Sequence, residues 1–279
     1  MTDPNRWSAP AHDPGAASFT GNIPDHYDRD LGPYIFADYA ADMARRTAAS
    51  RPMRVLEIAA GTGIVTRKLR DQLPAGAHLT ATDLNPPMID VARAKFRAGE
   101  QVTFQPADAL DLPFPDGTFD AVVCQFGVMF YPDKAKSYRE ARRVLAPGGR
   151  YHFSVWDSHR HNAFSRITHE TVTRLFPDDP PQFYQVPFGY HLIDPIKESL
   201  IEAGFRKIDA SVVALDTYVA DVAQLAQGLI FGNPLIEQIR AREGIDAELV
   251  RDALVEALRV EFGAGAATMQ TQSIVFEAS

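Results

Sequence analysis

The stretch VLEIAAGTGIVT, Val55 to Thr66, decides how this chain folds. An apolar run ends in Glu57 and Ile58, small residues follow as far as Gly63, and a helical pattern then begins at once. Small residues at such a turn let backbone N–H groups approach a ligand closely, and in an open α/β sheet ligands bind outside the carboxyl ends of the strands. The turn is therefore a predicted binding site.

Outward from this turn, short apolar runs alternate with helical patterns between Arg54 and Asp157. Such alternation is typical of βαβ units and predicts an α/β fold with a parallel sheet covered by helices on both faces. A strand-like run over 206–219, helices between Val222 and Phe262, and a final strand over 268–278 follow. The final strand is expected to join the same sheet, which makes the helices before it an insertion.

Two of the predicted helices have residues that indicate where they begin. The first spans Pro33 to Ala49, because apolar and charged residues alternate with helical spacing and proline suits a first turn. The second spans Asp194 to Ala203, with Asp194 as the residue that caps its start and Gly204 at its end.

Composition narrows the function. The 279 residues are 46% hydrophobic and 23% charged, as in ordinary globular proteins, and the net charge of −8 disfavours a nucleic-acid partner. The longest uncharged apolar run, Ala121 to Tyr131, is about half of a membrane-spanning helix, and the N-terminus lacks the pattern of a secretory signal. The single cysteine, Cys124, forms no disulfide within the chain, which favours the cytoplasm.

The residues around the turn discriminate between nucleotide ligands. No lysine followed by serine or threonine comes after the glycines, which argues against ATP. A dinucleotide site expects a third glycine where Thr66 stands, and Glu57 would lie unfavourably beside a pyrophosphate. The acid instead favours a ligand that carries a positive charge at this point.

Between Arg54 and Asp157 the sequence resembles the class I S-adenosylmethionine-dependent methyltransferases, most closely the ubiquinone/menaquinone C-methyltransferase group. That group also has an acid, small residues, G-T-G and a threonine in its first motif, although Ala59 here replaces a commoner first glycine. RRVLAPGGRYHFSVW (142–156) resembles a later family motif, in which Gly148 and Gly149 are structural. The resemblance implies a Rossmann-like, seven-stranded, mostly parallel sheet, an N-terminal helical lid, and S-adenosylmethionine as the cofactor.

The resemblance also assigns residues to the methionine part of that cofactor. Ala59, Gly61 and Gly63 would form the floor beneath it, Glu57 would face its ammonium group, and Thr66 would help to hold the turn.

For the nucleoside part, the resemblance places Asp83 on the ribose hydroxyls and packs Leu84 and Met88 against the adenine faces. Asp108 would accept the adenine amino group, and the Ala109 N–H would bond a ring nitrogen. A ribose-binding acid would serve NAD equally well, so Asp83 alone does not discriminate.

Gln125 is placed beside the methionine part, and Tyr27 is placed in the lid by analogy with related enzymes. Seven aromatic residues are candidates for lining a substrate pocket, with core packing as the alternative: Tyr27, Tyr34, Phe126, Tyr131, Trp156, Tyr184 and Phe188. No general base stands out, so the catalytic residues are unassigned; five weak candidates are His152, His159, His161, Tyr131 and Asp157. His159 and His161 lack further ligands at metal-site spacing, so no metal is expected.

The predicted organisation is a flexible arm over 1–24 and a single domain over 25–279. Within the domain, 52–157 form the cofactor-binding core, 158–262 supply substrate-side and inserted helical elements, and 268–278 form the last strand. The predicted activity is methyl transfer by in-line displacement to a small, partly apolar molecule, with carbon, nitrogen and oxygen acceptors all open.

Two other functions remain open. A nicotinamide-dependent oxidoreductase would share the glycine turn and Asp83, but it leaves Glu57 and Asp108 unexplained. A regulator that keeps the cofactor pocket without catalysis is consistent with the lack of an evident catalytic residue.

Overall fold

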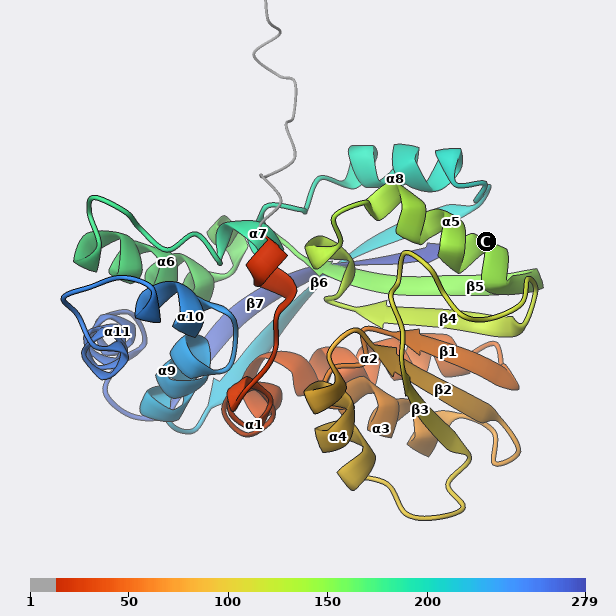
Figure 1. The fold of residues 1–279 in the computed structure, drawn as a ribbon, viewed down its shortest axis with the longest axis horizontal. Coiled ribbons are helices and arrows are strands. Elements are labelled where there is room, and N and C mark those ends of the chain that lie inside the picture. The colour runs from red at the N-terminus through yellow and green to blue at the C-terminus, as the bar shows by residue number, and fades with distance from the viewer. Residues whose placement is uncertain (1–13) are drawn as a thin grey trace, which may run out of the picture.

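The computed structural model describes residues 14–279 and builds one seven-stranded sheet in the order β3-β2-β1-β4-β5-β7-β6 (Figure 1). Neighbours from β3 to β5 pair in parallel, whereas β7 pairs antiparallel with both β5 and β6. The mostly parallel sheet is confirmed. The strands are β1 (Arg54–Ile58), β2 (His78–Asp83), β3 (Val102–Pro106), β4 (Phe119–Gln125), β5 (Leu145–Trp156), β6 (Ile208–Val219) and β7 (Ala267–Ala278).

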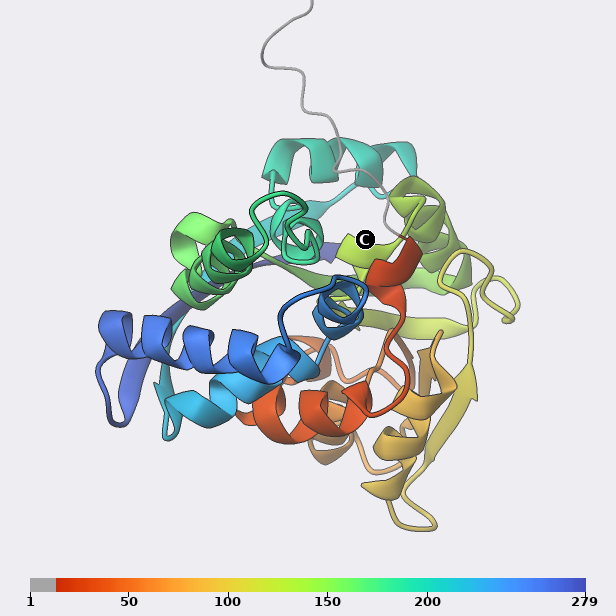
Figure 2. The same cartoon turned by 60° about the vertical axis from the view of Figure 1, so that its left-hand side comes forward.

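Helices cover both faces of this sheet (Figures 1 and 2). The α-helices are α1 (Ile23–His26), α2 (Ala37–Ala48), α3 (Ile64–Gln72), α4 (Pro86–Ala94), α5 (Lys134–Val144), α6 (Ala163–Leu175), α7 (Gln185–Phe188), α8 (Ile193–Glu202), α9 (Val222–Phe231), α10 (Leu235–Arg240) and α11 (Ala247–Phe262). Tighter or wider helical turns are η1 (Pro14–Ala17), η2 (Tyr27–Phe36), η3 (Val128–Phe130) and η4 (His159–His161).

Burial on both faces explains why the central strands read as continuous apolar runs. Val55 and Val123 pack with α2 and α3 in one core cluster, whereas Leu56, Val122 and Cys124 belong to the larger cluster on the other face, which includes α5 and α8. Successive side chains of a strand point to opposite faces, so a strand covered on both sides needs apolar residues throughout.

The pairing of β6 with β7 is the longest in the sheet, and the later helices pack beside it. β6 and β7 pair along 12 residues each and extend past the parallel strands toward α6, α9 and α11 (Figure 1). Helices α9, α10 and α11 lie between β6 and β7 in the chain, which confirms the predicted insertion.

The start of the N-terminal helix differs from the prediction. Helical structure begins at Ile23, and Pro33 lies inside η2, a π-helix, instead of in a first turn. Proline has no N–H to donate and its ring crowds the preceding turn, and the wider π turn accommodates it. The N–H of Ala37 donates to Gly32 O, five residues back, and the helix continues into α2.

The predicted cap at Asp194 is also wrong. Helix α8 begins at Ile193 after Leu192, so Asp194 lies inside the first turn and its side chain caps nothing. A carboxylate in the first turn is still favourable beside the positive end of the helix dipole.

Residues 1–13 of the predicted arm lie outside the described residues; in its remaining part Ala16, Ile23 and Pro24 are buried, whereas residues 20–22 are exposed. Within residues 14–279, no helix combines the length and the apolar character needed to cross a membrane.

Gly63 fixes how closely two helices approach. It stands before α3 with φ +80°, and a Cβ there would lie 2.8 Å from Ala92 Cβ on α4. Gly148 has the same φ of +80°, but a Cβ built on it has no neighbour within 4 Å. Alanine substitutions at these two glycines therefore distinguish the cost of backbone strain from the cost of a packing clash.

We predict that Gly148→Ala lowers the free energy of unfolding by about 1–2 kcal/mol, the strain of a left-handed alanine. Gly63→Ala adds the clash with Ala92 and should cost about 1–3 kcal/mol more. Urea unfolding of both variants measures the difference, and equal losses would contradict the assigned close packing of α3 on α4.

Candidate functional site

One large cavity lies at the carboxyl ends of the parallel strands, beneath the N-terminal helical segment. It encloses about 1120 Å³ of space, part of which is open to solvent, and its walls come from segments as distant as Ala17 and Asn233. Most of the predicted cofactor residues line it: Tyr27, Ala59, Gly61, Asp83, Leu84, Met88, Asp108, Ala109 and Gln125. The topology thus brings residues from four strand ends and the lid to one place.

The turn after β1 is built from left-handed residues. Ala59 has φ +54° and Gly61 has φ +56°. A left-handed alanine costs about 1–2 kcal/mol, so the surrounding structure must enforce this conformation at Ala59. Gly127, after β4, allows the close approach that does so, since a Cβ there would lie 2.6 Å from Ala59 Cβ and 2.7 Å from Cys124 Sγ. The sequence analysis did not single out Gly127.

The carboxylate of Asp83 joins the ends of β1 and β2. Its Oδ2 accepts the N–H of Gly61 at 2.9 Å, and its Oδ1 accepts the N–H of Asn85 at 2.8 Å. Burial raises the pKa of Asp83, and these backbone donors offset part of that rise. The Asn85 side chain also donates to Oδ1, at 3.3 Å, and the Leu84 backbone contributes as well. A carboxylate has about four acceptor positions, so Asp83 would take hydroxyl donors in the cavity only in part alongside, or in exchange for, these contacts.

Glu57 is 2% exposed and lies behind the turn, in a smaller cavity of about 290 Å³ with Tyr27, Ala59 and Gln125 on its walls. Burial raises the pKa of Glu57 to about 8; the nearby Thr66 hydroxyl lowers it and Asp83 raises it further.

Two buried acceptor atoms in this region have no hydrogen-bond partner among the described residues: Glu57 Oε2 and Gln125 Oε1. Buried polar atoms in native proteins are nearly always paired, so these oxygens indicate a missing donor. A positively charged N–H group is the donor that a buried carboxylate favours. Of the predicted cofactor residues, Glu57, Gly63 and Thr66 do not line the large cavity.

At the opposite end, Met88 is buried whereas Leu84 is 57% exposed beside the cavity mouth. Asp108 is exposed and its Oδ1 accepts the N–H of Leu110, which leaves its other oxygen without a protein donor.

Asn85 is a lining residue that the sequence analysis missed. It precedes α4, yet its side chain donates to Ala17 O at 3.0 Å and accepts the N–H of Phe19 at 3.3 Å. An asparagine before a helix is typical of an ordinary helix cap, so nothing in the sequence indicated that Asn85 binds residues 17–19. The contact places residues 17–19 over the exposed end of the cavity.

The remaining part of the cavity is aromatic. Phe126 and Trp156 stack with ring centroids 4.0 Å apart, and Phe36 and Phe188 lie against Trp156 at 6.2 and 5.7 Å. Tyr131, Tyr184 and further phenylalanines complete the wall, whereas Tyr34 does not line it and instead bonds Gln224 on α9. Among the described lining residues, Asp83 and Asp108 carry the acidic groups and no lysine or arginine is present.

Of the weak catalytic candidates, Tyr131 lines the cavity. Its hydroxyl lies 3.3 Å from Cys124 Sγ, and burial raises the pKa of Tyr131 well above its usual value, so it is neutral at pH 7. His152 is buried within the sheet, His159 lies behind Phe188, and Asp157 bonds Gln272 and Ser158.

Across residues 14–279, no group of three or more histidine, cysteine or acidic side chains is placed to hold a metal ion.

Comparisons with known proteins agree with this geometry. A family model described as a methyltransferase domain matches residues 55–149. The ubiquinone/menaquinone biosynthesis C-methyltransferase UbiE of Idiomarina loihiensis is 32% identical over 175 residues, 57% of this chain and 68% of that protein. The demethylmenaquinone methyltransferase of Thermus thermophilus is 41% identical over 139 residues, 50% of this chain. That alignment spans 61% of the Thermus protein, less than two thirds of its length.

Solved structures share the fold at low sequence identity. Phosphoethanolamine N-methyltransferase 2 of Haemonchus contortus, solved with S-adenosyl-L-methionine, superposes with a TM-score of 0.58 at 19% identity, covering 91% of this chain and 56% of that one. The YcgJ protein of Bacillus gives 0.55 at 18% identity, covering 86% and 97%. The chain therefore belongs to the family of S-adenosylmethionine-dependent methyltransferases and is similar to its ubiquinone/menaquinone C-methyltransferases.

Proposed function

We propose that this protein is a methyltransferase that uses S-adenosylmethionine to methylate a small, partly apolar molecule. The observation that carries the proposal is the buried, unpartnered pair of acceptors Glu57 Oε2 and Gln125 Oε1 behind a left-handed glycine turn. These acceptors suit the ammonium group of a methionine moiety and have no use in a site for a pyrophosphate.

The residues of the cavity fit the rest of that cofactor. Asp83 would accept ribose hydroxyls alongside, or in exchange for, its contacts with Gly61 and Asn85. Met88, with an adaptable side chain, would pack against adenine, and Asp108 would accept its amino group. Glu57 would neutralise the ammonium group.

The aromatic part of the cavity would hold the acceptor. Stacked rings such as Phe126 and Trp156 favour a flat or apolar molecule, and the absence of lysine and arginine from the described lining disfavours an anionic one. Bound S-adenosylmethionine supplies a methyl group on a positively charged sulfur. The chain's own task is then to align the acceptor and to exclude water, which these rings and the lid do. Tyr131 would serve as a neutral hydrogen-bonding group, since its high pKa excludes the role of a base at pH 7.

We further propose a single domain over 25–279 that works in the cytoplasm without a nucleic-acid partner. The net charge of −8 and the one buried, free cysteine, Cys124, support this assignment.

The proposal is tested first by calorimetric titration of the full chain with S-adenosylmethionine, S-adenosylhomocysteine and NAD. We expect both sulfur nucleosides to bind and NAD not to bind. Formation of S-adenosylhomocysteine is then measured with uncharged aromatic and with anionic acceptors, and the first group should react. Binding of NAD alone would favour an oxidoreductase, and cofactor binding without any turnover would favour a regulator.

Replacing Asp83 tests the ribose assignment. Charge-assisted hydrogen bonds contribute roughly 1.5–3 kcal/mol, so Asp83→Ala should weaken S-adenosylhomocysteine binding about ten- to a hundredfold. Asp120→Ala is the matched control, because Asp120 also accepts two backbone N–H groups, those of Met53 and Arg54, but at the other end of the sheet. It should lose stability and keep its affinity. An unchanged affinity in Asp83→Ala would refute the assignment.

The raised pKa of Glu57 predicts that the affinity for the cofactor depends on pH. With a pKa of about 8 it is mostly protonated at neutral pH, and a bound ammonium group favours the charged form. Binding should therefore release a proton, and affinity should rise by up to about tenfold per pH unit until the pH reaches about 8. Calorimetry in buffers of different ionisation enthalpy measures this proton release. Glu57→Gln removes the contribution and leaves the ligand's own titration, so identical pH profiles for both proteins would contradict the prediction.

A further inference from the structure

The lid, defined here as residues 23–36 of α1 and η2, closes the cavity through Tyr27, Leu31, Ile35 and Phe36. Two of its carboxylates, Asp28 and Asp30, point to opposite neighbours. The difference between these two attachments indicates where the lid opens.

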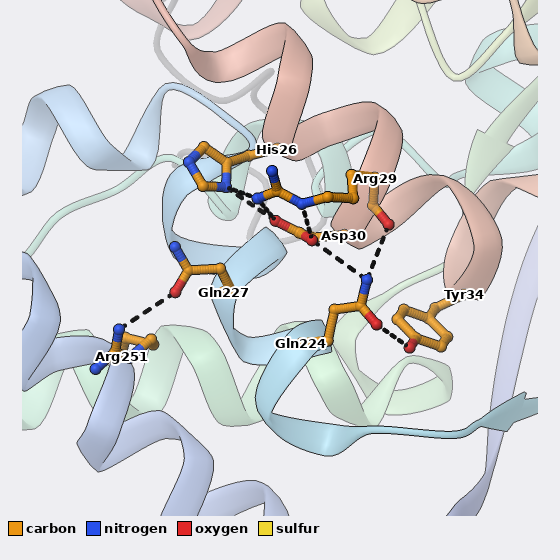
Figure 3. Close-up of polar contacts among 7 residues, drawn as sticks. All are labelled: His26, Arg29, Asp30, Tyr34, Gln224, Gln227 and Arg251. Carbon is orange, nitrogen blue, oxygen red and sulfur yellow. Dashed lines mark hydrogen bonds and ion pairs between the residues drawn. The ribbon is translucent and has the colours of Figure 1, made fainter.

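Asp30 attaches the lid to α9 (Figure 3). Its side chain is 3% exposed and accepts from Arg29 at 2.8 and 2.7 Å and from Gln224 at 3.3 Å, with His26 at 2.9 Å. Gln224 also donates to Arg29 O and accepts the hydroxyl of Tyr34 at 2.7 Å. Separating the lid from α9 would break three hydrogen bonds of Gln224, those to Asp30, to Arg29 O and to Tyr34, while Asp30 would keep Arg29 and His26.

Packing on the same side is equally close. A Cβ on Gly228 of α9 would lie 2.7 Å from Leu31 Cδ2 and 2.8 Å from Asp30 O, and one on Gly232 would lie 3.0 Å from Tyr27 N. Figure 2 shows the lid lying along α9. The lid and α9 therefore behave as one packed unit.

Asp28 attaches the lid to the cofactor side. Its Oδ1 accepts the Thr62 hydroxyl at 2.7 Å, within the turn after β1, and pairs with Lys95 at the end of α4. The Asp28 and Lys95 side chains are 28% and 27% exposed. Neither residue lines the large cavity. On this side the lid also packs at Gly32, where a Cβ would lie 3.1 Å from Ile64 Cδ1, but that neighbour is the flexible end of a side chain, whereas on the α9 side backbone atoms lie as close. A partly exposed ion pair contributes little to stability, so we take the seam between Asp28 and Lys95 as the side that opens at lower cost.

We propose that Asp28 and Lys95 form a gate: they hold the lid and α9 closed over the glycine turn, and their separation sets the rate at which the cofactor enters and leaves. The pair is distinct from the binding residues, because it touches the lid and the turn and not the cavity. This inference rests on the proposed function for the identity of the ligand.

The test measures association and dissociation rates of S-adenosylhomocysteine on the immobilised full chain by surface plasmon resonance. Lys95→Met removes an ion pair of modest strength, so both rates should rise about two- to fivefold while the affinity changes less than twofold. A binding contact would instead raise the dissociation rate alone. Arg93→Met is the matched control, since Arg93 lies on the same helix and pairs with Asp90, not with the lid; its rates should match those of the unaltered protein.

A mutant cycle isolates the pair itself. Asp28→Asn keeps an oxygen for Thr62 and removes the charge, so it should accelerate exchange as Lys95→Met does, and the double variant should be no faster than either single one. Lys95→Arg should restore slow exchange. The proposal would be refuted if the two substitutions accelerated exchange additively, or if Lys95→Met left both rates unchanged.

Gln224→Ala tests the attachment of the lid to α9. It should lower the melting temperature with little effect on exchange, because α9 is expected to move with the lid. Acceleration equal to that of Lys95→Met would place the opening at α9 and refute the proposal. Absence of any S-adenosylhomocysteine binding in the unaltered protein would instead overturn the proposed function, and the gate with it.

Discussion

The hydrogen bond from the Gly61 N–H to the Asp83 carboxylate is the contact on which the site depends. It joins the turn after β1 to the end of β2, and the N–H of Ala60 donates to Thr82 O at 2.8 Å beside it. With the turn fixed at both points, Ala59 and Gly61 hold left-handed conformations that an unsupported loop would leave. The floor of the cavity is therefore rigid before any ligand arrives, which reduces the entropic cost of binding.

The same arrangement concentrates acidic groups where water is excluded. Glu57 and Asp83 are both buried near the turn, and each raises the cost of ionising the other. Because the pKa of Glu57 is higher in the folded chain than in the unfolded one, the stability that its protonated form supports is present at low pH and falls as the pH rises toward about 8. A bound cation would reverse this loss. The site thus gives up stability of the free protein for affinity toward a positively charged ligand.

The sequence predicted the sheet and the turn at its edge, because there the local residue pattern alone determines the structure. The alternation of strands and helices and the turn around Gly61 identified the sheet and the cavity floor, because parallel strands bring their carboxyl ends together whatever lies between them. It missed Asn85 and Gly127, whose roles come from contacts with residues 66 and 68 positions away, such as Phe19, Ala17 and Ala59. It also misplaced the helix start at Pro33, since a π turn that tolerates an internal proline leaves no local signature.

The position of the lid was equally unpredictable from the sequence, because it depends on residues far away in the chain. Its position depends on Gly228 of the inserted helix α9, on Gly232 directly after that helix, and on Gln224, almost 200 residues after the lid in sequence. In a single sequence Gly228 is typical of a weak point in a helix, costing about 1 kcal/mol relative to alanine, and Gly232 is typical of an ordinary helix end. Their use becomes clear once the lid backbone is seen to approach at a distance that no Cβ allows. The insertion between β6 and β7 therefore helps to form the cavity, because the lid packs on it and Asn233 lines the cavity wall.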